Sequence, residues 1–115
     1  MVLNIGEPDS SMSDVFKDKF NRSIRLTSER KAHIEKHPEM KNQMDKIKET
    51  IQNPDFIRCS AFDESVLLFY KPYAETPVGE KYLLVAVKIL NSHGFIITAF
   101  FTDKLKKGEH VWPKD

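Results

Sequence analysis

The most basic stretch of the chain holds the side chains best suited to acid–base and phosphate chemistry. Arg25, Arg30, His33 and His37 lie close together in it, among lysines and only two glutamates. An arginine offers a forked set of donors to a phosphate, and a histidine exchanges protons near neutral pH. The stretch therefore predicts a phosphate-binding or other anion-binding site. The alternative is the solvated face of a charged helix, which has the same composition.

His33 and His37 are four residues apart, which is the spacing of the two zinc-binding histidines of a metalloprotease helix. Here Glu35 does not stand directly beside the first histidine, and Pro38 turns His37 away from the helix. No third ligand follows nearby, so we expect no metal site. The sequence also has no glycine-rich phosphate loop and no nucleophile elbow. This removes support for NTPase, protease and esterase functions, and we expect no cofactor.

A second polar set interrupts the apolar runs of the C-terminal half. Lys88 interrupts the run over residues 83–90, and Thr98 interrupts the next one. The odd-numbered positions of the first run are uniformly apolar, so they predict the face toward the helices and leave Lys88 on the other face. A three-residue loop, Ser92–Gly94, would place Lys88 opposite Thr98, whereas a loop of two or four residues would place it opposite Ile97. The alternative for Lys88 is an ordinary polar position on a solvated face.

The tail over residues 102–112 carries three lysines, His110 and the only tryptophan, Trp112. A nucleic-acid interpretation assigns the lysines, Lys104 among them, to backbone phosphates and an aromatic ring to base stacking. For Trp112 itself we favour a structural role, in which the ring anchors the C-terminal segment to the core.

The pattern of elements divides the chain at residue 22. Residues 1–22 are expected to be a leader that is partly mobile or contains a short helix, because turn formers come first and Val15, Phe16 and Phe20 then recur at helical spacing. Residues 23–112 are expected to form one domain, since a chain of 115 residues is too short for a second independent core.

Helices are predicted in the first part of this domain. An extended segment over residues 23–27 leads into a helix that begins at Thr27 or Ser28 and ends near Lys36. Pro38 suits the start of a second helix. The apolar stripe of that helix consists of Met40, Met44, Ile47 and Ile51.

Strands are predicted in the second part, where β-branched and aromatic residues dominate over residues 56–60, 65–71, 81–90 and 95–102. The connections are short, which favours antiparallel pairing, and the helices precede the strands instead of alternating with them. We therefore predict an α+β fold, with N-terminal helices followed by a four-stranded antiparallel sheet.

Composition excludes several classes of protein. The formal net charge is +1, so the surface is not uniformly basic, although a local basic patch remains compatible with this balance. Cys59 is the only cysteine, so no disulfide forms within the chain. No apolar run is long enough to span a bilayer and no secretory signal is recognisable, so we expect a cytoplasmic protein without a membrane segment.

Several motifs together resemble a known family. They are Ile24–Arg30, His33-Ile34, His37–Met40, Ile51–Asp55, Phe69–Lys71, Tyr82–Lys88, Phe95–Thr102 and Lys107-Gly108 in a tail ending at Trp112. This succession resembles the phage-associated nuclease-fold domains of the PBECR type, which are grouped with barnase, EndoU, colicin nucleases and RelE toxins. The resemblance covers residues 23–112 and implies the BECR or RelE-like fold, a ribonuclease-like site on the sheet and a phage or toxin setting.

The resemblance implies a metal-independent endoribonuclease that cleaves RNA by attack of the 2′-hydroxyl. Such a reaction needs proton transfer and positive charge on the phosphate. As catalytic residues we predict His33 or His37 for proton transfer, Lys88 on the phosphate and Thr98 for orientation by hydrogen bonding, with Tyr70 as the alternative for orientation. As substrate-binding residues we predict Arg25, Arg30, Tyr70, Lys71 and Lys104.

The predicted partners are RNA and, because toxin-like nucleases commonly meet an inhibitor, an antitoxin or immunity protein. A non-catalytic RNA- or protein-binding module of the same fold is the alternative function. A structural or interaction domain of phage origin is a third interpretation.

Overall fold

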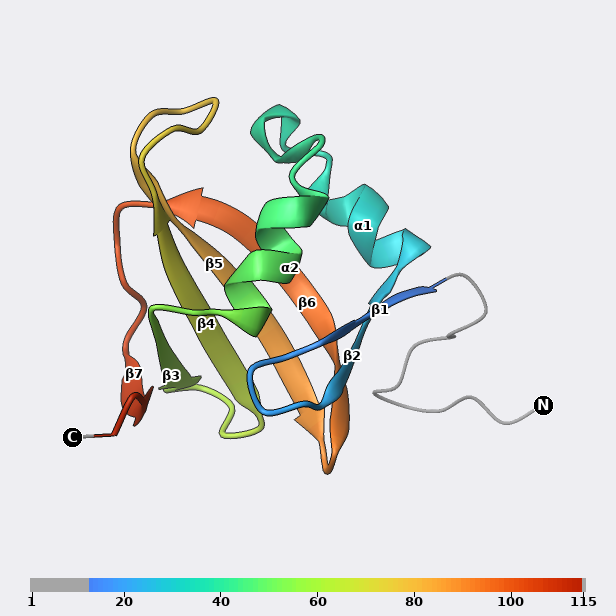
Figure 1. The fold of residues 1–115 in the computed structure, drawn as a ribbon, viewed down its shortest axis with the longest axis vertical. Helices are drawn as coiled ribbons and strands as arrows, with labels where there is room; N and C mark the ends of the chain where they lie inside the picture. The colour runs from blue at the N-terminus through green and yellow to red at the C-terminus, as the bar shows by residue number, and fades with distance from the viewer. Residues whose placement is uncertain (1–12, 115) are drawn as a thin grey trace.

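The computed structural model describes residues 13–114, which form one seven-stranded sheet with two α-helices and a short 3-10 helix on one side of it (Figure 1). The strand order is β1-β2-β6-β5-β4-β3-β7. β2 and β6 are parallel, and all other neighbours are antiparallel. In chain order the elements are β1 (Ser13–Lys17), β2 (Ser23–Thr27), α1 (Ser28–Ile34), the 3-10 helix η1 (Pro38–Met40), α2 (Met44–Gln52), β3 (Phe56–Ser60), β4 (Val66–Tyr73), β5 (Lys81–Leu90), β6 (His93–Thr102) and β7 (Gly108–Trp112).

The predicted fold class is wrong. The protein is mostly β, with a mixed seven-stranded sheet over residues 13–114, and not an α+β fold with N-terminal helices before a four-stranded antiparallel sheet. The four predicted strands are present as β3 to β6 and pair as an antiparallel meander. The remaining three strands lie outside this meander, β1 and β2 on one side and β7 on the other. β2 coincides with the extended segment predicted over residues 23–27, but β1 and β7 were not predicted. All three strands are short, and two of their three pairings join segments far apart in the chain, so the local pattern does not reveal how they join the sheet.

A β-hairpin replaces the short helix expected in the leader. β1 pairs with β2 along its whole length. The Asp18 carboxylate holds the turn, because it accepts hydrogen bonds from the backbone N–H groups of Phe20 at 2.9 Å and Arg22 at 2.8 Å. Asn21 adopts a positive φ of 65°, which asparagine tolerates. The rest of the predicted leader, residues 1–12, lies outside the described residues.

The predicted helix start at Thr27 or Ser28 is confirmed. The Thr27 hydroxyl caps α1 by accepting a hydrogen bond from the Arg30 backbone N–H at 3.1 Å.

The second predicted helix is divided in two. Pro38 begins η1, and α2 begins only at Met44, after Asn42 has taken a positive φ of 62°.

Two apolar layers cover the two faces of the sheet. The larger layer joins α1, η1 and α2 to the sheet, and its members include Ile24, Leu26, Ile34, Met40, Ile47, Ile51, Phe69, Leu83 and Val85. Trp112 packs against this layer, so its predicted role as an anchor is confirmed. The smaller layer contains strand residues only: Val66, Leu68, Tyr70, Leu84 and Ala86, with Phe56, Tyr82, Ile97 and Phe100 packed against them. We call this second side the helix-free face.

The β5–β6 connection sets the register around Lys88. The turn has two residues, so Leu90 pairs with His93 and Lys88 lies opposite Phe95. Both predicted partners, Thr98 and Ile97, are therefore wrong, and the register expected for a two-residue loop is corrected, since such a loop places Lys88 opposite Phe95 and not Ile97. A bulge in β6 follows, because Val87 pairs with Ile96 whereas Ala86 pairs with Thr98. The extra residue returns Thr98 to the same face as Lys88.

Candidate functional site

Cationic and hydroxyl side chains from four strands lie in two adjacent cross-strand rows on the helix-free face. The first row consists of Arg25, Phe95, Lys88 and Val66. The second row consists of Thr98, Ala86, Leu68, Arg58 and His110. Residues paired across strands project from the same face, so the two rows place three cations beside an apolar floor. The expectation that Lys88 lies on the face opposite the helices is confirmed.

A cavity of about 460 Å³ opens on this face. Its floor is apolar, and Lys106 and Lys107 from the β6–β7 connection form part of its wall. Phe62 stands at the β3–β4 turn with 94% of its surface exposed. The complete lining is Ser60, Phe62, Val66, Leu68, Ala86, Ile97, Lys106 and Lys107. Lys88, Thr98 and Arg58 are the direct cross-strand partners of Val66, Ala86 and Leu68, so they lie next to residues that line this cavity.

The Lys88 ammonium already has an anionic partner. Its Nζ donates to Oδ2 of Asp63 at 2.8 Å. Asp63 also accepts hydrogen bonds from the hydroxyl and the backbone N–H of Ser65, at 2.6 and 3.0 Å. Lys88 first, and Ser65 second, hold the pKa of the Asp63 carboxyl well below its ordinary value. Asp63 is therefore ionised at neutral pH and orients Lys88.

The β6–β7 connection is tied to the sheet by two hydrogen bonds. The backbone N–H of Lys106 donates to the Tyr70 hydroxyl at 2.9 Å, and Arg58 Nη1 donates to the Lys106 carbonyl at 3.0 Å. Tyr70 is fully buried, and burial raises the pKa of its phenol. Tyr70, predicted to bind substrate, therefore holds the backbone of Lys106, whose ammonium lies 5.7 Å from the Phe100 ring centroid.

His93 was not among the predicted site residues, because it falls in the loop expected before the last predicted strand. The two-residue turn makes it the first residue of β6, and it alternates with Phe95 onto the helix-free face. It is thereby a diagonal neighbour of both Lys88 and Arg25, at a separation of about 7–8 Å that long side chains span. Only the register could have shown this.

The predicted histidines lie on the other side of the sheet. α1 packs through Ile34 on the helix-covered face, and the His33 side chain is exposed on its outer surface. Arg30 and His33 line a shallow cavity of about 330 Å³ with Glu29, Ala32 and Lys36. His37 is an exposed residue immediately before η1. The structure thus brings Lys88, Thr98 and Arg25 together but separates them from His33, His37 and Arg30.

The two other predicted substrate residues have different surroundings. Lys71 Nζ donates to the Asn53 carbonyl at 2.9 Å and so fixes the segment between α2 and β3. Lys104 is exposed in the β6–β7 connection, where its backbone N–H donates to the Thr102 hydroxyl at 3.0 Å.

The described residues contain neither a cluster of metal ligands nor a helix suited to crossing a membrane. Over residues 13–114, no group of three His, Cys, Asp or Glu side chains is placed to hold a metal ion. No helix in that part of the chain combines the length and the apolar character needed to cross a membrane.

A sheet with one helix-covered face and a cationic, partly aromatic opposite face is a surface suited to a polyanion. The comparison with known families agrees with a protein that binds a polyanion. The family model PBECR2, phage-Barnase-EndoU-ColicinE5/D-RelE like nuclease2, matches residues 2–112. The chain belongs to this nuclease-like family, and the resemblance inferred from its motifs is confirmed. Searches among curated proteins and among solved structures gave no match.

Proposed function

We propose that the chain is a metal-independent endoribonuclease whose cleavage site lies on the helix-free face. In this reaction the 2′-oxygen forms a bond to the adjacent phosphorus while the bond to the 5′-oxygen breaks. The products carry a 2′,3′-cyclic phosphate and a 5′-hydroxyl. One group must take the 2′-hydroxyl proton, another must protonate the leaving oxygen, and cations must stabilise the charge that develops on the phosphate.

The observation that carries this proposal is the register, which makes Lys88, Arg58 and Thr98 the cross-strand partners of three residues that line one cavity. The two cations are assigned to the phosphate, and the Thr98 hydroxyl is assigned to its orientation. Arg25 adds charge at the far end of the first row, and Lys104 adds charge on the β6–β7 connection. An apolar floor next to these groups favours an RNA base over a second charged group.

His93 is assigned to proton transfer, because it is the histidine nearest to Lys88 by register. His33 and His37 are the second assignment, which follows from the sequence alone. A phosphate held by Lys88 is on the opposite side of the sheet from both of them. Cleavage through His33 would therefore use the shallow cavity beside α1 and would not need Lys88.

The test is incubation of a mixed RNA with the purified protein in EDTA, followed by analysis of the product ends. The parent is expected to produce 2′,3′-cyclic phosphates. Lys88→Ala and His93→Ala are each expected to lower the cleavage rate about 100-fold or more. His33→Ala is the matched control, since it removes an exposed histidine on the other side, and it is expected to retain the parental rate. If His33→Ala lost cleavage while Lys88→Ala and His93→Ala kept the parental rate, the cleavage site would lie beside α1.

The same samples also distinguish the nuclease from the alternative function, a non-catalytic binding module. A binder would retard labelled RNA in a gel with a steep dependence on salt and leave it intact. Intact RNA in every lane, with or without retardation, would overturn the nuclease proposal.

A further inference from the structure

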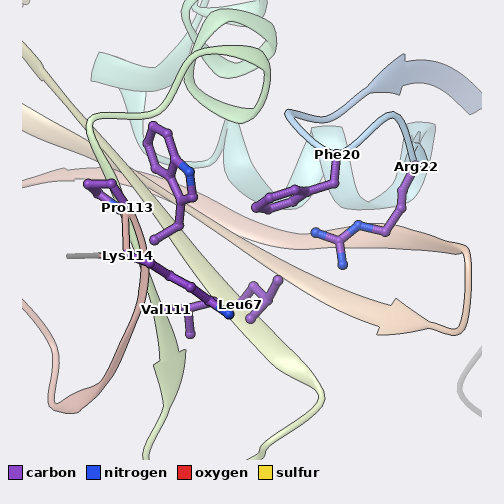
Figure 2. Close-up of a pocket in the computed structure, with 7 residues that line it drawn as sticks. Phe20, Arg22, Leu67, Val111, Pro113 and Lys114 are labelled. Carbon is purple, nitrogen blue, oxygen red and sulfur yellow. The ribbon is translucent and has the colours of Figure 1, made fainter.

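A second and larger cavity lies on the helix-covered side of the molecule. It has a volume of about 650 Å³, in the range typical of ligand pockets, and forms between the β1–β2 turn and the end of β7. Figure 2 shows Phe20 and Arg22 on one side of it, and Val111, Pro113 and Lys114 on the other. Leu67 and Trp112 complete the lining, and both pack against the helix-side core. This cavity is therefore separated by the sheet from the proposed cleavage site.

Aromatic rings and cations alternate around this cavity. Phe20 and Trp112 supply the rings, and 46% of the Phe20 surface is exposed. The Lys19 ammonium lies 4.1 Å from the Trp112 ring centroid, and the Arg22 guanidinium carbon lies 5.0 Å from the Phe20 ring centroid. With Lys114, three cations adjoin the cavity. The surroundings thus suit a ligand that is both planar and anionic.

The carboxylate of Asp18, which pairs with Arg22 beside the cavity, is fully used by the turn. Asp18 accepts from Arg22 Nε at 2.7 Å as well as from two backbone N–H groups, and its side chain is fully buried. The other end of the guanidinium differs. Arg22 Nη2 is buried and has no hydrogen-bond partner within the described part of the chain. A buried donor without a partner is unusual, and because Arg22 lines the cavity, a shift of its side chain would let an anionic oxygen there satisfy this donor.

We propose that this cavity binds one nucleotide of a single-stranded nucleic acid, with the base beside Phe20 and Trp112 and the phosphate on Arg22 and Lys114. The proposal rests on the proposed ribonuclease function and adds a second contact to it. An acidic protein segment would also suit the cations, but two aromatic rings on one cavity favour a base.

The position of β7 gives the RNA a route between the two sites. β7 is an edge strand of the sheet, with Lys106 and Lys107 just before it and Lys114 just after it. An RNA chain that leaves the cavity on the helix-free face would contact these lysines as it passes round the β7 edge of the sheet. Contacts beyond the scissile phosphate then raise the affinity for longer RNA.

The single tryptophan of the chain makes the test direct, because Trp112 lines the cavity. Adenosine monophosphate, a probe too small to span both sites, is titrated against the protein while tryptophan fluorescence is followed at an excitation that the nucleotide does not absorb. We expect saturable quenching, weaker for adenosine without the phosphate. Phe20→Ala and Lys114→Glu are each expected to lower the affinity about fivefold or more.

Phe62→Ala is the matched control. Phe62 is a more exposed phenylalanine, and it lines the cavity on the opposite face, so its removal should leave the quenching curve unchanged. Absence of quenching by the nucleotide would overturn the proposal. Equal quenching by an oligoglutamate peptide would also overturn it, in favour of an acidic protein ligand.

The result of the fluorescence titration does not depend on whether the protein cleaves RNA. RNA cleavage without quenching would retain the proposed function and reject this second site. Quenching without cleavage would retain the nucleotide site in a protein that only binds.

Discussion

Lys88 Nζ and Asp63 Oδ2 lie 2.8 Å apart and join the C-terminal end of β5 to the β3–β4 turn. The same turn carries Phe62, which lines the same cavity as Val66, the cross-strand partner of Lys88. The cation that we assign to the phosphate is thus oriented by a carboxylate in the free protein. RNA must therefore displace Asp63 or share Lys88 with it.

Asp63→Asn is expected to strengthen RNA binding. The variant keeps an oxygen for the Ser65 hydrogen bonds but removes the charge that competes with phosphate for Lys88. Exposed ion pairs contribute little, so the expected decrease in KM is about twofold to fivefold. Glu64→Gln removes a neighbouring exposed charge and serves as the control. Steady-state cleavage at low salt measures both, and equal changes in the two variants would show only a general loss of negative charge.

Lys88→Ala is expected to raise the pKa of Asp63 toward its ordinary value near 3.9. A carboxyl whose pKa is lowered on folding adds stability above the unfolded pKa, and that stability is lost as pH falls through the folded pKa. The ion pair should therefore persist from neutral pH to below about pH 4. NMR titration of the Asp63 side-chain carbon in parent and variant measures the shift. The same pKa in both proteins would assign the effect to Ser65 instead.

Tyr70→Phe is expected to loosen the β6–β7 connection. The hydroxyl is buried and accepts the Lys106 backbone hydrogen bond at 2.9 Å, so its removal leaves that N–H without its partner. The free energy of unfolding should fall by about 1–2 kcal/mol, and amide exchange at Lys106 should accelerate. Tyr82→Phe, in the same aromatic cluster, is the control. Unchanged exchange at Lys106 would mean that Arg58 alone holds the connection.

Local signals in the sequence were sufficient for the central elements. The Thr27 cap located the start of α1, and β3 and β5 occupy the predicted residues. The parallel pairing of β2 with β6 joins residues far apart in the chain, and no local pattern encodes it. This pairing changes the fold class, because it adds the N-terminal hairpin to the sheet.

The candidate site was predictable only in part for the same reason. Alternation placed Lys88 on the helix-free face, but the bulge that places Thr98 beside it cannot be seen in the sequence. His33 and His37 drew attention because they lie near several cations in the chain. That proximity gives no information about the sheet that lies between them and Lys88.

The Asp18–Arg22 pair provides the last prediction. Asp18 is buried at the turn that replaced the expected helix, and it binds two backbone N–H groups and Arg22 Nε. Asp18→Ala leaves these donors without their acceptor and Arg22 without its counter-charge. The expected loss in the free energy of unfolding is about 3 kcal/mol, measured by urea denaturation.

Asp14→Ala, which removes an exposed carboxylate from β1, is the control and should change stability by less than about 0.5 kcal/mol. Asp18→Asn separates the two contributions of Asp18, because an amide oxygen still accepts from the turn but no longer carries the charge. If Asp18→Asn is as stable as the parent, the turn hydrogen bonds alone account for the role of Asp18. If Asp18→Ala is also as stable, the hairpin does not depend on this turn, and the position of Arg22 in the second cavity must be fixed by its contact with Phe20.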